Sequence, residues 1–146
     1  MNNPSGNARP GLSALLASAL FTVAMGSGVA SAQQVKVTLS GDQEVPSVKT
    51  AGAGSGAISV AADKSVSESV TTTDVAGTMA HIHEAAPGKN GPVVIPLSKS
   101  GDSTWSVPAG AKLTDAQLSS FKAGNLYVNV HSAANPGGEV RGQLKP

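Results

Sequence analysis

The sequence contains no cysteine among its 146 residues. Disulfides, catalytic thiolates and cysteine-based zinc sites are therefore excluded, and histidine and carboxylate remain as the metal-ligating side chains. Aromatic residues make up only 3% of the chain, and Trp105, Phe121 and Tyr127 are the ones that follow residue 32. So few aromatics argue against a stacking platform for single-stranded nucleic acid or a carbohydrate groove.

The chain also has almost no excess of positive over negative charge. The formal net charge is +1, and the lysines are spread singly along the chain without a basic cluster. Binding to nucleic acid or to anionic lipid depends on such clusters. The sequence therefore predicts no nucleic-acid partner.

The first 32 residues have the layout of a secretory signal. Arg9 gives a weak positive region, residues 12–29 are largely apolar, and Ala30-Ser31-Ala32 supplies a small-x-small cleavage pattern. We expect cleavage after Ala32, which leaves residues 33–146 as one secreted or periplasmic domain without a membrane span. The alternative is a retained transmembrane anchor, which the small and polar residues within the apolar stretch make less favourable.

Short runs of alternating apolar and polar residues recur after the signal and predict strands. The expected strands cover residues 35–39, 57–62, 66–75, 78–84, 93–95, 104–107, 125–131 and 138–144, with a glycine-rich loop over 42–55. Turn-forming residues separate them. This number of short strands favours a mainly β fold, either an antiparallel Greek-key β-sandwich or a flattened barrel.

One short helix interrupts the strands. Thr114 and Gln117 form a capping-box pattern, in which each side chain satisfies a main-chain N–H of the first turn. Gly124 is a natural stop for a helix of about two or three turns.

The three histidines of the chain are candidate metal ligands. His81 and His83 are two residues apart in one predicted strand and so share a face, and His131 ends another predicted strand. If these strands are neighbours, three imidazoles converge on one copper or zinc ion and leave a position for water or substrate. The alternative is that they are ordinary strand residues, each hydrogen-bonded or half-exposed.

Other polar residues are expected to support this site. A carboxylate near the histidines would act as a fourth ligand or accept a hydrogen bond from an imidazole N–H. The carboxylate candidates are Glu44, Glu84 and Glu139, and the further residues expected around the site are Tyr127, Asn129 and Arg141. For Glu139 and Arg141, which share one face of the last strand, an exposed ion pair is the simpler interpretation.

Several motifs occur in the order seen in a known family. The segments at residues 39–46, 80–83, 91–94, 127–131, 135–136 and 138–144 resemble those of the CHRD domain. This domain is named for the animal antagonist chordin and is widespread in secreted bacterial proteins. The resemblance covers nearly all of residues 33–146 and implies an exported module, with an extracellular protein as a possible partner. It implies no settled biochemical activity.

A looser likeness concerns the histidines alone. A His-x-His strand followed by a glycine-rich loop and a later histidine strand looks like the copper and zinc superoxide dismutases, which are Greek-key sandwiches. On that analogy His81, His83 and His131 match copper-binding positions. No histidine remains for a fourth copper ligand or for a zinc loop, and the disulfide of that family is impossible here.

Three hypotheses follow from the sequence. The first is an exported protein that holds one metal ion through three histidines, for storage or a redox role. The second is an extracellular structural or protein-binding module without metal. The third is an enzyme, either dismutase-like or a hydrolase that uses metal-bound water.

Overall fold

The computed structural model describes residues 31–146. The predicted secretory signal lies outside the described residues except for Ser31 and Ala32, so its cleavage stays a prediction. The described chain forms strands β1 (Gln33–Ser40), β2 (Ala53–Val60), β3 (Val66–Ser67), β4 (Ser69–Thr73), β5 (Gly77–Glu84), β6 (Val93–Pro96), β7 (Ser98–Lys99), β8 (Thr104–Ser106), β9 (Leu126–Ser132) and β10 (Val140–Leu144), a 3-10 turn η1 (Gly41–Gln43) and helix α1 (Asp115–Lys122).

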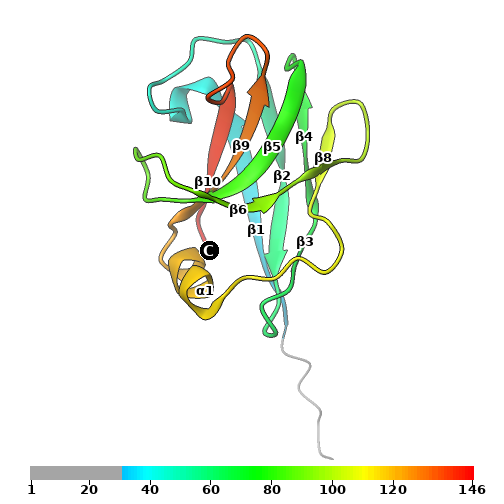
Figure 1. Cartoon of the computed structure of the whole chain (residues 1–146), viewed down its shortest axis with the longest axis vertical. Coiled ribbons are helices and arrows are strands. Elements are labelled where there is room, and N and C mark those ends of the chain that lie inside the picture. Colours follow the sequence, from blue (N-terminus) through cyan, green and yellow to red (C-terminus); the bar gives the residue numbers. More distant parts are fainter. Residues whose placement is uncertain (1–30) are drawn as a thin grey trace, which may run out of the picture.

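The strands form one antiparallel sheet that nearly closes on itself (Figure 1). Their order is β6-β5-β9-β10-β1-β2-β4-β8-β7, with β3 paired to β2. The two ends of this order are consecutive in the chain, because only Leu97 separates β6 from β7. The Leu97 N–H donates to the carbonyl of Ala80 in β5 at 2.9 Å. The predicted fold class is confirmed, in its flattened-barrel form.

Non-sequential pairing brings the histidine strands together. Strands β4 and β5 are consecutive in the chain but are not neighbours in the sheet, and β5 pairs with the much later β9. In this pairing His81 lies opposite Asn129, and His83 lies opposite Tyr127. The strands predicted to carry the metal ligands are therefore direct neighbours.

Alternation along the strands fills the barrel with aliphatic side chains. Ala80 and Ile82 of β5 are buried, as are Val128 and Val130 of β9. Side chains alternate along a strand, so His81, His83 and His131, each next to one of these buried residues, lie on the outer surface of the barrel wall. The site is thus built on the outside of a rigid sheet.

The glycine-rich segment differs from the prediction. Residues 53–55 belong to β2, where the sequence predicts a loop, and β2 continues through Gly56. Gly56 lies where the backbone of β4 approaches closely, and a Cβ there would meet the Val70 Cα at 2.6 Å and also clash with the Ser69 carbonyl oxygen. Glycine in a strand is typical of such close backbone approach.

The predicted long strand over residues 66–75 is also wrong. Glu68 has φ of 85°, in the left-handed region that side chains rarely adopt, and it divides the segment into β3 and β4. The chain thereby leaves its pairing near the end of β2 and pairs again nearer the start of β2.

The predicted helix is confirmed. The Gln117 N–H donates to the Thr114 hydroxyl oxygen at 3.2 Å, and the Thr114 N–H donates to Gln117 Oε1 at 2.9 Å. Gly124 follows the helix with φ of 76°. The helix lies at one end of the barrel, near the C-terminus (Figure 1). In residues 31–146 no helix has both the length and the apolar character needed to cross a membrane.

Candidate metal centre

The outer face of β5, β9 and β10 carries a cluster of polar side chains that loops partly cover. The cluster comprises His81, His83, Tyr127, Asn129, His131 and Arg141. The covering loops are residues 85–92 after β5 and residues 133–139 before β10. All six residues are predicted site residues, so the fold brings them to one surface.

The three histidines converge. One ring nitrogen from each of His81, His83 and His131 lies within 4.8 Å of the other two. His81 Nδ1 and His131 Nε2 are 3.0 Å apart, at hydrogen-bond distance. The three ring centroids are 4.9 to 5.9 Å from one another.

Main-chain carbonyls fix the tautomers of two of these rings. His83 Nδ1 lies 3.0 Å from the Gly91 carbonyl oxygen, and His131 Nδ1 lies 3.0 Å from that of Pro136. A carbonyl oxygen only accepts, so each Nδ1 carries the hydrogen and donates it. Nε2 of both rings consequently carries a lone pair rather than a hydrogen, which is the arrangement common to metal-binding histidines. The lone pair of His131 Nε2 accepts a hydrogen bond from His81 Nδ1.

One of these lone pairs is buried without a partner. His83 Nε2 makes no hydrogen bond within the described residues although it is shielded from solvent. Leaving a buried acceptor unsatisfied costs about 1–3 kcal/mol. A cation at this atom would satisfy it, so the chemistry of the donor set fits a metal ion.

The surroundings also favour the neutral forms of His81 and His83. Burial lowers the pKa of His81, and the neighbouring His131 and His83 lower it further. Burial also lowers the pKa of His83, partly opposed by its hydrogen bond to Gly91. Neutral imidazole is the form that binds metals.

The spacing of the nitrogens suits a small ion after modest closure. A tetrahedral ion with bonds of roughly 2.0–2.1 Å spaces its ligand nitrogens by roughly 3.3 Å. The 3.0 Å between His81 Nδ1 and His131 Nε2 is close to that value. Other nitrogen pairs lie within the 4.8 Å limit and need only side-chain movement to reach it.

An aromatic stack supports His83 from one side. The Tyr127 ring lies parallel to His83, with centroids 4.9 Å apart and planes inclined by 6°. The guanidinium of Arg141 lies on the Tyr127 ring, its Cζ 3.4 Å from the centroid. Arg141 is only 1% exposed, so the predicted exposed ion pair with Glu139 is wrong. Packing against Tyr127 and hydrogen bonds of 3.3 Å to Asn90 Oδ1 and Gln143 Oε1 hold this side chain.

None of the three predicted carboxylates belongs to the group of converging ligand atoms in residues 31–146. Glu44 Oε1 accepts from Asn129 Nδ2 at 2.6 Å. Glu84 accepts from the Ser120 hydroxyl of α1 at 2.5 Å, and Glu139 accepts from the Thr50 hydroxyl at 2.7 Å. Glu44 therefore supports the cluster through Asn129, while Glu84 and Glu139 fasten neighbouring segments.

Glu44 has the most perturbed carboxyl group of the three. Burial raises the pKa of Glu44 to about 7, and the Asn129 hydrogen bond and the Arg141 charge oppose this rise. For Glu139 the direction is reversed, because hydrogen bonds from Ser132 and Thr50 lower its pKa.

Two supporting residues were missed by the sequence analysis. Gly91 and Pro136 orient His83 and His131 through main-chain carbonyls, which carry no side-chain signal. Gly91 also donates its N–H to the Tyr127 hydroxyl at 3.2 Å. Their place in turn-rich segments next to the histidine strands is the one indication that the sequence offers.

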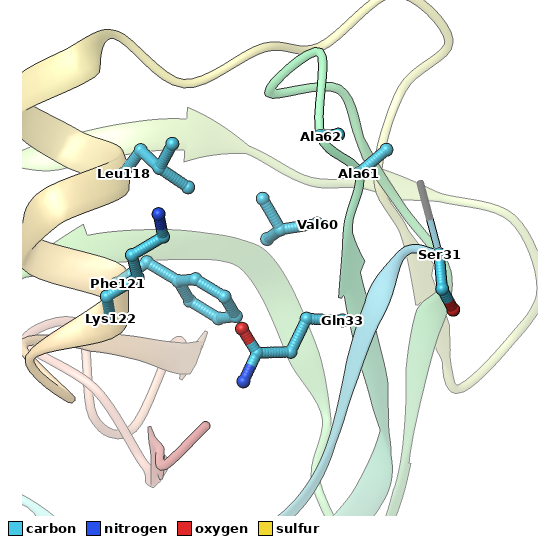
Figure 2. A pocket seen from close by; sticks show the side chains of 8 residues that line it. All are labelled: Ser31, Gln33, Val60, Ala61, Ala62, Leu118, Phe121 and Lys122. Carbon is cyan, nitrogen blue, oxygen red and sulfur yellow. The ribbon is translucent and has the colours of Figure 1, made fainter. Parts of the chain in front are cut away.

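A cleft of about 270 Å³ between α1 and the strands β1 and β2 is a separate hollow. Figure 2 shows Leu118 and Phe121 of α1 on one side of it and Val60 of β2 on the other. Among the lining residues in the described part of the chain, Lys122 alone is charged. It offers apolar surface without a set of converging polar groups, so the histidine cluster is the better functional candidate.

Comparison with known proteins assigns most of the chain to one family. The model of the CHRD domain matches residues 35–144. That range includes every predicted site residue. No curated protein and no solved structure shows significant similarity to the chain.

Proposed function

The chain belongs to the CHRD domain family, and we propose that it is an exported module that binds one copper or zinc ion through His81, His83 and His131. The observation that carries this proposal is the convergence of three imidazoles around the buried, unpartnered His83 Nε2.

The residues of the cluster have distinct roles in this proposal. His83 and His131 bind through Nε2, because their Nδ1–H groups are engaged by the carbonyls of Gly91 and Pro136. His81 would contribute Nδ1, which now lies against His131 Nε2, and its ring hydrogen would then be on Nε2. A bound copper ion adds redox capacity and a bound zinc ion adds Lewis acidity.

Tyr127 and Arg141 position the ligands without binding the ion. The stack of Arg141, Tyr127 and His83 limits rotation of the His83 ring. Locking a ligand in place before the ion arrives reduces the ordering that binding requires. The domain thus holds its ligands on a rigid sheet rather than on loops alone.

Export completes the proposal. The family of the domain and the small-x-small pattern before Gln33 together support secretion or periplasmic release, with cleavage after Ala32. A cysteine-free histidine site suits an oxidising compartment, because no thiolate is available for oxidation.

Metal content measured without an affinity tag tests this proposal. Purified protein is saturated with copper or zinc, freed of loosely bound ions by gel filtration and analysed for metal per chain. We expect about one ion per wild-type chain, because three nitrogen ligands leave the site nearly complete. His83→Gln and the triple variant with alanine at residues 81, 83 and 131 are expected to lose it.

The control is Asp102→Asn, which changes an exposed acid outside the cluster. It should retain the wild-type metal content. Circular dichroism of each metal-free variant checks the fold. One ion per chain in a folded triple variant, or none in the wild type, would contradict the proposal.

A second candidate is an extracellular protein-binding module that uses this face without metal. Met79 of β5 is 49% exposed and Val93 of the adjacent β6 is 50% exposed, which gives the region some apolar surface. Val93 is paired with His83, four residues beyond Met79 in β5, so these two separate side chains offer much less apolar surface than a typical protein interface. A wild-type chain that takes up no metal would favour this candidate.

A further inference from the structure

Met79 lies beside the proposed metal site. It precedes His81 by two residues in β5, so the two side chains are on the same face of the strand. In the pairing of β5 with β9, Met79 lies directly opposite His131. Opposite residues of an antiparallel pair have Cβ atoms about 4.5–5.5 Å apart, which a methionine side chain easily spans.

Nothing in the packing of the barrel accounts for this methionine. Its side chain is 49% exposed, whereas Ala80 and Ile82 of the same strand are buried. Exposed methionine contributes little to a hydrophobic core, but its three rotatable bonds and soft sulfur let it reach a nearby ligand.

The strand is irregular just before Met79. The register of β5 against β9 shifts between Gly77 and Met79. Gly77 itself is held close to Trp105, where a Cβ would meet Cζ2 at 2.7 Å. Such irregularities occur next to functional sites and redirect the side chains that follow.

We propose that the Met79 thioether is the fourth ligand and that the site thereby selects copper(I) over zinc. This inference rests on the proposed metal site. Carboxylates favour hard ions, and none belongs to the converging ligand group in the described residues. Thioether sulfur is a soft ligand that favours copper(I), so three imidazoles and one thioether match that ion.

Competition against a copper(I) chelator under anaerobic, reducing conditions tests the selection. Met79→Leu keeps the approximate size of the side chain. We expect it to lower copper(I) affinity at least about tenfold, because it removes one soft ligand. Zinc affinity should stay within about threefold of wild type, because the three nitrogen ligands remain. Val93→Ala is the control, since it trims an exposed side chain on the adjacent strand and removes no donor atom.

Methyl NMR gives a readout that does not depend on affinity. The chain has three methionines, and Met79 is the one within residues 31–146. In full-length protein labelled at the methionine methyl groups, the spectrum of Met79→Leu assigns the Met79 signal. We expect copper(I), or silver(I) as its air-stable substitute, to shift this signal and zinc to leave it nearly unchanged.

The outcomes separate the two proposals. If His83→Gln binds both metals like wild type, the histidine site itself is wrong. If His83→Gln loses metal while Met79→Leu keeps its copper(I) affinity and the Met79 signal does not shift, the histidine site stands and the thioether ligand is overturned.

Discussion

Glu44 shows how one residue links the loop after β1 to the polar cluster. The residue is only 7% exposed, and its carboxyl group accepts a hydrogen bond of 2.6 Å from Asn129, which lies opposite His81. Gly138 packs against this hydrogen-bonded pair, since a Cβ on Gly138 would meet the Asn129 amide at 2.6 Å and Glu44 Oε1 at 2.7 Å. The buried acid therefore has little freedom to reach water.

Burial of this acid makes stability depend on pH. The pKa of Glu44 rises from 4.5 to about 7 on folding, so the folded protein holds a proton that the unfolded chain has released. Stability from this group is fully present below pH 4.5 and is lost as pH rises through 7. In the metal-free protein, Glu44→Gln should remove this loss.

Denaturant unfolding at several pH values measures the effect. The variant should gain stability relative to wild type as pH rises from 4.5 to 8, up to a limit of about 3 kcal/mol at about 1.4 kcal/mol per pKa unit. Near pH 4 the two proteins should differ least, which serves as the internal control. A difference that stays constant from pH 4 to 8 would contradict the buried-acid explanation.

The sequence indicated the three histidines as a candidate site, but it did not indicate how buried each residue around them is. His81, His83 and His131 were predictable as candidate ligands because they are the chain's only histidines and two share a strand face. The burial of Arg141 was not predictable, because it depends on Tyr127 of another strand. Contacts between distant segments carry no local pattern in the sequence.

At the scale of elements, structure that depends on neighbouring residues was predictable from the sequence. Structure that depends on close approach of another strand was not. The capping box of Thr114 and Gln117 involves only neighbouring residues, so the start of α1 was predictable. The glycines at residues 54 and 56 are typical of a loop, yet they belong to β2 because β4 lies against them. Glycine has the same sequence signal in both settings.

Substitution of Gly56 tests this account of β2. A Cβ on Gly56 meets main-chain atoms of β4, which cannot move aside as a flexible side chain would. Gly56→Ala should lower the free energy of unfolding by about 1–3 kcal/mol, the usual cost of overpacking. Thermal or denaturant unfolding measures the change.

Gly101→Ala is the matched control for that substitution. Its nearest neighbours would be Thr104 side-chain atoms at 3.5 Å, an ordinary contact. We expect a change within about 0.5 kcal/mol, as for most surface substitutions. Equal losses for the two variants would show that close approach of β4 is not what requires glycine at residue 56.

At the scale of the whole molecule, the barrel turns two separate segments into one site. The alternating strands made a mainly β fold predictable, but the pairing of β5 with β9 depends on the closed topology. Strand order is set by long-range packing, which periodicity does not encode. The barrel wall fixes the histidine backbones, and the loops at residues 85–92 and 133–139 supply the carbonyls that orient the rings.

The central claim is that these three histidines bind one ion. Anomalous diffraction from crystals of the protein grown with copper or zinc tests it most directly. We expect one peak on the outer face of β5 and β9, roughly 2.0–2.1 Å from a ring nitrogen of each of His81, His83 and His131. Metal-soaked crystals with no peak at this cluster, and with His81 still hydrogen-bonded to His131, would contradict the claim.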